Sequence, residues 1–129
     1  MGLKGMMGTL KEKAAGLEDL AEEKVNEWLD EYKKATAVLA TFGFTVDKFT
    51  VGLGLPPEIH TSFSGSIEKV HPENLKKMIE EHQGESLLIG LLKALILARR
   101  CWERVELKVT AVTLNVTLGV PPAIAVDIH

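Results

Sequence analysis

Six polar residues with period-two spacing form the part of this sequence that is best suited to chemistry: Glu58, His60, Ser62, Ser64, Ser66 and Glu68. Successive side chains of a β-strand point to opposite faces, so this spacing places all six on one face. Glu58 beside His60 suits a general base with its orienting carboxylate, or two metal ligands, and the serines would line a polar site. A solvated sheet face rich in serine explains the same row. A small enzyme or metal site on Glu58, His60 and Ser62 is therefore the alternative function.

The other histidines and the single cysteine provide no further catalytic or metal motif. His60, His71, His82 and His129 lack metal-ligand spacings such as the pair in HExxH, and no glycine-rich phosphate loop occurs. Cys101 lies near the expected end of a helix, which opposes thiolate formation, so we expect a buried, structural cysteine. We therefore predict no catalytic residue, metal or cofactor, and favour a binding module over an enzyme.

The leading functional hypothesis rests on an apolar segment, Leu87 to Leu97. A helix expected over Ser86 to Trp102 is apolar all round as far as Ala98, apart from Lys93. Such a helix must be covered on more than one side. Four alternatives could bury these sides of the helix: the core of a layered fold, a second subunit, a lipid-like ligand or a membrane surface. We expect this helix and the bent strands to form a homo-oligomer interface or a cleft for an apolar ligand. The residues predicted for that role are Leu87, Leu88, Leu91, Leu92, Leu95 and Ile96.

Two nearly identical phrases with paired prolines mark corners of the fold. LGLPPEI occupies residues 53–59 and LGVPPAI occupies residues 118–124. Proline has a fixed φ and no N–H donor, so each pair must lie at an edge, a bulge or a corner of a sheet. Each pair is either a wide turn, with Gly54 or Gly119 supplying an unusual φ, or a rigid kink in a strand. The predicted structural corners are Gly54, Pro56, Pro57, Gly119, Pro121 and Pro122.

The segments around these phrases predict an α+β fold with an internal duplication. In both copies the apolar alternation changes phase once, after Val46 and after Ala111, as a bulge in a long bent strand would produce. An amphipathic helix over Thr9 to Ala40 precedes the first copy, and a short helix begins at Pro72. We expect duplicated units of helix, bent strand, Pro-Pro and strand. They would form a mainly antiparallel four-stranded sheet with helices packed on one face. Residues 1–129 would form a single domain with halves near 9–69 and 72–129, and residues 1–8 would be disordered.

Charge and hydropathy restrict the partners. The chain has 129 residues, 18 acidic and 15 basic, with a net charge of -3, which argues against a nucleic-acid partner. Its longest apolar run is too short to cross a bilayer, and the N-terminus does not read as a signal peptide, so we expect a cytoplasmic protein. Self-association or an apolar small molecule is the expected partner. A second alternative is peripheral membrane association through the N-terminal MGLKGMMGTLKEK.

Overall fold

The structure is a computed structural model that describes residues 23–54 and 56–129. Its first helix covers residues 23–40 and leads into the first two strands, β1 (Thr45–Gly52) and β2 (Glu58–Ser66). A short 3-10 turn, η1 (Ile67–Lys69), then connects to the helices α2 (Pro72–Glu81) and α3 (Ser86–Arg104). The last two strands are β3 (Ala111–Leu118) and β4 (Ala123–Ile128). The predicted helix residues 9–22 lie outside the described part of the chain.

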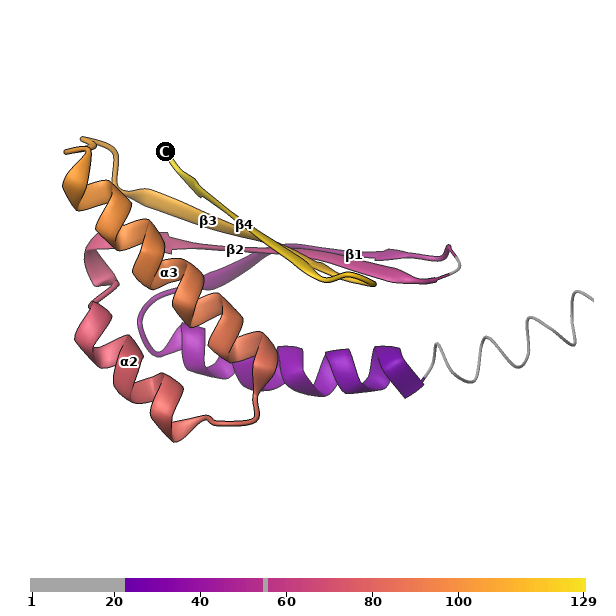
Figure 1. Ribbon diagram of the computed structural model, residues 1–129. Helices are drawn as coiled ribbons and strands as arrows, with labels where there is room; N and C mark the ends of the chain where they lie inside the picture. The colour runs from indigo at the N-terminus through magenta and orange to yellow at the C-terminus, as the bar shows by residue number, and fades with distance from the viewer. Residues whose placement is uncertain (1–22, 55) are drawn as a thin grey trace, which may run out of the picture.

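The four strands form one antiparallel sheet in the order β1-β2-β3-β4 (Figure 1). Strands β2 and β3 are separated in sequence by α2 and α3, yet they pair along their length, with Phe63 opposite Leu114. The predicted α+β class and antiparallel four-stranded sheet are therefore confirmed.

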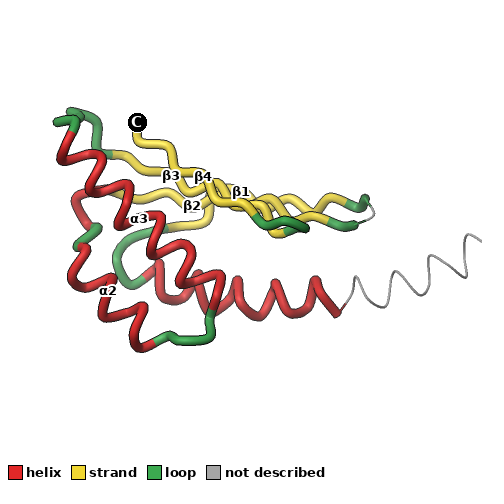
Figure 2. The backbone as a smooth tube through the Cα atoms, viewed as in Figure 1, coloured by secondary structure: helices red, strands yellow, loops and turns green. Residues whose placement is uncertain are grey.

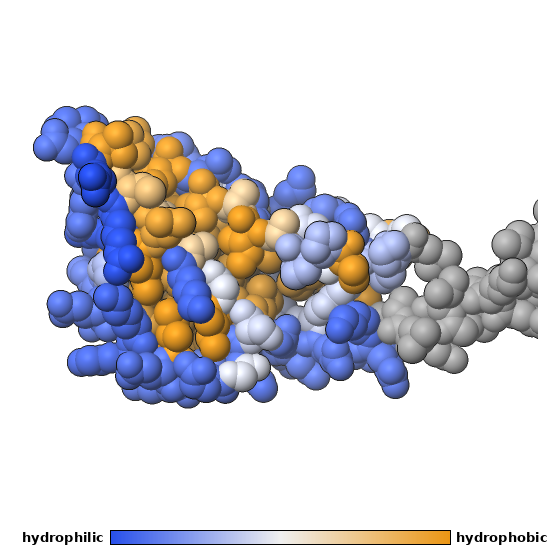
Figure 3. Space-filling view, viewed as in Figure 1, coloured by the Kyte–Doolittle hydropathy of each residue, from blue (hydrophilic) through white to orange (hydrophobic). Residues whose placement is uncertain are grey.

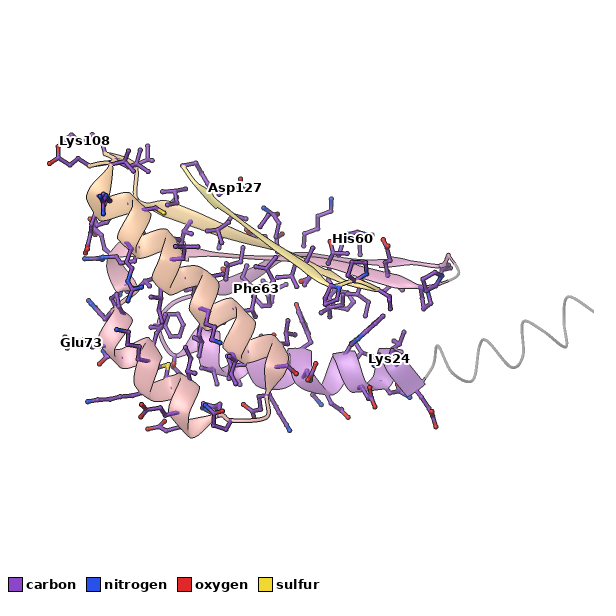
Figure 4. The ribbon with its side chains drawn as sticks, in the orientation of Figure 1. Lys24, His60, Phe63, Glu73, Lys108 and Asp127 are labelled. Carbon is purple, nitrogen blue, oxygen red and sulfur yellow. The ribbon has the colours of Figure 1, made fainter. Side chains whose placement is uncertain are left out.

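The helices lie together on one face of the sheet (Figure 2). Strand alternation explains this layering, because Ile59, Thr61 and Phe63 of β2 are buried whereas Glu58 and His60 are exposed. Figure 4 shows Phe63 between the sheet and the helices, with His60 on the sheet away from the helical layer. One sheet face is therefore available for polar interactions, and the other forms the core.

Both Pro-Pro pairs lie in loops that reverse the chain between antiparallel strands, the first between β1 and β2 and the second between β3 and β4. The predicted unusual φ at Gly54 or Gly119 is wrong, because the described glycines with positive φ are Gly43 and Gly84. Gly119 instead lies close to the Glu58 side chain, since an added Cβ would be 3.2 Å from its Cγ. The internal duplication remains a prediction.

The two predicted phase breaks have different structural origins. In β1 the pairing register shifts between Val46 and Lys48, near the first predicted break. The second prediction, a bulge after Ala111 in a long strand, is wrong. Residues 105–110 form the connection from α3 to β3, and β3 begins at Ala111. This connection is fixed in part by Trp102, whose Nε1–H donates to the carbonyl oxygen of Val109 at 2.7 Å.

Candidate functional site

The six apolar residues predicted for an interface or ligand all lie in the core, with exposed fractions of 9% or less: Leu87, Leu88, Leu91, Leu92, Leu95 and Ile96. They belong to the same cluster as Leu39, Phe63 and Leu114. The chain's own helices and sheet therefore cover these sides of α3. Leu97 is different, because 62% of it is exposed. Cys101 is also exposed, so the prediction of a buried cysteine is wrong.

An apolar depression of about 370 Å³ lies between the first helix, the start of α3 and the β3–β4 hairpin. We call it the helix–hairpin groove. Its apolar lining residues are Trp28, Leu87, Gly90, Val116, Leu118, Pro122, Ala123 and Ile124. Trp28 is itself 9% exposed and belongs to the core cluster, so one wall of the groove is continuous with the core. Three segments that are distant in sequence thus form one apolar surface.

Gly90 of α3 lies against the side chain of Ile124 in β4 along this groove. An added Cβ at Gly90 would lie 3.2 Å from Cδ1 of Ile124, which is closer than ordinary van der Waals contact. The glycine therefore lets the Ile124 side chain lie against the helix. A larger residue at position 90 would enter the space of the groove.

The mouth of the groove carries more acidic than basic groups. A neighbouring hollow shares Trp28, Glu31, Ser86 and Pro122 with the groove, and its charged lining residues are Lys24, Glu27, Asp30 and Glu31. Lys24 Nζ lies 3.5 Å from Glu27 Oε2, and the Ser86 hydroxyl donates to Glu31 Oε1 at 3.2 Å. With three carboxylates and one amine, the mouth favours a positively charged group.

His60 lies on the outer face of the sheet, where both of its ring nitrogens have partners. Nε2 lies 3.0 Å from Glu58 Oε2, and Nδ1 lies 3.2 Å from the hydroxyl of Thr117. In the tautomer whose Nε2–H donates to the carboxylate, Nδ1 is the acceptor for a hydrogen bond from the Thr117 hydroxyl. Both ring nitrogens are thus engaged by side chains of the protein itself, and Glu58 is placed to orient the ring.

The rest of the outer face is a hydrogen-bonded polar surface. The Ser64 hydroxyl bonds to the Asp47 carboxylate and lies 3.0 Å from the Thr113 hydroxyl, and Asn115 Nδ2 donates to Asp127 Oδ2 at 2.6 Å. His60 and Ser62 line a shallow depression of about 160 Å³. In the described residues, no three His, Cys, Asp or Glu side chains form a group that could hold a metal ion.

The predicted polar row is shorter than its six residues. Strand β2 ends at Ser66, whose hydroxyl accepts a hydrogen bond from the backbone N–H of Glu68 in η1. Glu68 therefore does not belong to the strand face. Period-two spacing could not reveal this, because it does not indicate where a strand ends.

The N-terminal segment predicted to contact a membrane lies outside the described residues. Across residues 23–54 and 56–129, no helix has the length and apolarity needed to cross a bilayer.

The sequence analysis missed most of the helix–hairpin groove. Pro122 was predicted as a corner, and Leu87 was the only groove residue among the predicted ligand contacts. Trp28 in an amphipathic helix was the one available signal, but the sequence did not indicate that this helix lies beside the second hairpin.

Comparisons of the chain with protein-family models, with curated proteins and with solved structures give no match.

Proposed function

We propose that this protein is a non-enzymatic binding module that holds a small apolar ligand in the helix–hairpin groove. The observation that carries this proposal is the volume and lining of the groove. About 370 Å³ falls within the range of about 300–1,000 Å³ that is typical of small-molecule sites. Such sites are mainly apolar, as this lining is, with a few polar groups that orient the ligand.

The charges at the mouth indicate which polar end the ligand would have. Glu27, Asp30 and Glu31 outnumber Lys24, so a cationic head would be attracted and an anionic head would be repelled. We infer an amphipathic ligand with an alkyl or aromatic body and an amine or similar cationic group.

We also propose that the two hairpins arose by internal duplication and that the protein is cytoplasmic. The similar LGLPPEI and LGVPPAI segments support a duplicated hairpin, of which the second copy contributes to the groove. At the start of the strand after Pro-Pro, the first copy has Glu58 and His60 where the second has Ala123 and Ala125. The two hairpins would thus have acquired different surfaces.

A single cysteine fits a reducing compartment such as the cytoplasm.

Titration with two probes of equal chain length tests the ligand class. We expect octylamine to bind and to shift the backbone amide signals of Gly90 and Ile124 in two-dimensional NMR spectra. Octanoate should bind at least about tenfold more weakly, which corresponds to about 1.4 kcal/mol. Equal shifts with both probes would contradict the proposed charge preference.

One variant and its control test the location of the site, and a third variant tests the charge preference. Gly90→Leu should fill the groove and lower octylamine affinity at least about tenfold. Ala37→Leu adds a side chain of the same type at an exposed position of the first helix, outside the groove, and should leave affinity unchanged. Asp30→Lys should reduce the preference for octylamine over octanoate. Circular dichroism confirms that each variant is folded, and unchanged binding by folded Gly90→Leu would overturn the proposal.

A further inference from the structure

We propose that a second copy of this chain pairs with the free edge of β4, so that two sheets join across a two-fold axis. The proposal does not require a ligand in the groove, although Ile124 belongs both to the groove and to this edge. It rests on the hydrogen-bonding pattern of β4 and on the exposed apolar residues of α3 beside that strand.

The two edge strands of the sheet differ in their protection against pairing. Edge strands expose unpaired N–H and C=O groups, and proteins commonly protect them with a bulge or a lysine. Strand β1 has both devices, a register shift between Val46 and Lys48 and the lysine itself. Strand β4 reads AIAVDI, pairs with β3 in unbroken register and contains no lysine, proline or bulge. Among residues 23–54 and 56–129, no strand pairs with the outer edge of β4, so this edge can accept another strand.

The direction of the free backbone groups follows from one pair of hydrogen bonds. Ala111 and His129 exchange both of their bonds, with N···O distances of 3.0 and 2.8 Å. In an antiparallel ladder such pairs alternate with pairs whose polar groups point outward. Counting back along the regular β3–β4 ladder, the N–H and C=O groups of Ile124, Val126 and Ile128 face the open edge.

Only one antiparallel pairing of two β4 edges uses the outward N–H and C=O groups of Ile124, Val126 and Ile128 together. It places Val126 opposite Val126 of the second copy, and Ile124 opposite Ile128 in both directions. The three apolar side chains of each copy then face their counterparts on the helical side of the joined sheet. On the outer side Asp127 lies opposite Ala125. A register centred on Asp127 would set like charges directly opposite each other, which is unfavourable.

Helix α3 extends the apolar surface beside β4. It runs along β4 in the same direction, and Figure 3 shows apolar side chains gathered over these two elements. Gly90, which faces Ile124, is followed on the same side of the helix by Ala94, Leu97 and Cys101. Leu97 is 62% exposed, which leaves a large apolar side chain in water unless another chain covers it. A second copy on the β4 edge brings its own α3 to this surface.

Sedimentation equilibrium over a range of concentrations tests the association of the full chain. We expect a reversible dimer, and Leu97→Glu should raise its dissociation constant at least about tenfold, because it places a carboxylate in an apolar contact. Leu53→Glu is the matched control. Leu53 is 91% exposed, lies in the loop between β1 and β2, and its replacement should leave the dimer unchanged.

Cysteine cross-linking in a Cys101→Ser background tests the register. Val126→Cys places two thiols on the two-fold axis, where the Cα atoms of a hydrogen-bonded pair lie about 5.5 Å apart. This separation permits a disulfide. Ala123→Cys is the control, because the two copies of residue 123 would be about 20 Å apart at a rise of about 3.4 Å per residue. Mild oxidation should therefore give covalent dimers of Val126→Cys and not of Ala123→Cys.

Each result decides the proposal. A monomer at every concentration overturns it, and so does a dimer that Leu97→Glu leaves intact. A dimer in which Ala123→Cys cross-links and Val126→Cys does not overturns the pairing of β4. Octylamine binding by Leu97→Glu is measured in parallel, since Leu97 does not line the groove, and this separates a failed dimer from a failed ligand site.

Discussion

Close packing of an aromatic ring on a glycine fixes the start of the sheet. Phe44, which is 2% exposed, precedes β1 and lies over Gly65 of β2. An added Cβ at Gly65 would lie 2.7–2.8 Å from three ring atoms of Phe44, a distance that side chains do not tolerate. A glycine inside a strand commonly marks such a close approach. The link between the first helix and the sheet therefore depends on this residue.

Gly65→Ala is predicted to destabilise the protein by about 1–3 kcal/mol, because the methyl group forces the buried Phe44 ring to move. Urea denaturation followed by circular dichroism measures the change in unfolding free energy. Gly54→Ala is the control, because its Cβ would meet only ordinary contact and its effect should stay within about 0.5 kcal/mol. Equal losses in both variants would contradict this role of Phe44.

At the scale of elements, helix α3 is the centre of the fold. Its apolar run makes contact with the sheet, the first helix and α2, which explains why so few polar residues occur between Leu87 and Ala98. The sequence correctly predicted that this helix must be covered on several sides. The structure adds that the described residues cover most of this helix and leave Leu97 62% exposed.

Leu92→Ala is predicted to cost about 2–5 kcal/mol of unfolding free energy, because the residue is fully buried and its truncation leaves a cavity. Leu53→Ala removes the same atoms from a side chain that is 91% exposed, and should change stability by less than about 0.5 kcal/mol. Chemical denaturation of both variants gives the comparison. A loss below about 1 kcal/mol for Leu92→Ala would place that residue outside the core.

At the scale of the whole molecule, the two halves share one core. Strand β2 of the first half pairs with β3 of the second, and the core cluster contains Leu39 and Phe63 together with Leu91 and Leu114. Neither half could bury these residues alone. That the whole chain forms a single domain stays a prediction.

The two tryptophans can report separately on the halves, because Trp28 lies in the first helix and Trp102 near the end of α3. We predict that Trp102→Phe and Trp28→Phe each show one fluorescence transition in urea that coincides with the loss of circular dichroism. A shared core unfolds as one unit, and coincident transitions are its signature. Separate midpoints for the fluorescence and circular dichroism signals would show independent halves.

The parts of the fold that sequence could predict are those set by local periodicity. Period-two spacing placed Glu58 and His60 on the outer face of β2, whereas Ser62 of the same row is 8% exposed. Three-and-four spacing predicted a helix over Thr9 to Ala40, of which residues 23–40 are described and helical. Alternation failed at Val105, Leu107 and Val109, which lie in a connection, because exposed loop residues can alternate by chance. Spacing also gave no information about Thr117 of β3, whose hydroxyl lies 3.2 Å from Nδ1 of His60.

The sequence by itself determined the class of the fold, the apolarity of α3 and the positions of the Pro-Pro corners, because these depend on side chains close together in the chain. The tertiary structure alone decided that Trp28, Gly90 and Ile124 form one groove, and that β4 has an open edge beside Leu97. Both features join segments that are far apart in sequence. No local spacing of residues encodes which helix lies against which hairpin, because that choice is made by the packing of the whole core.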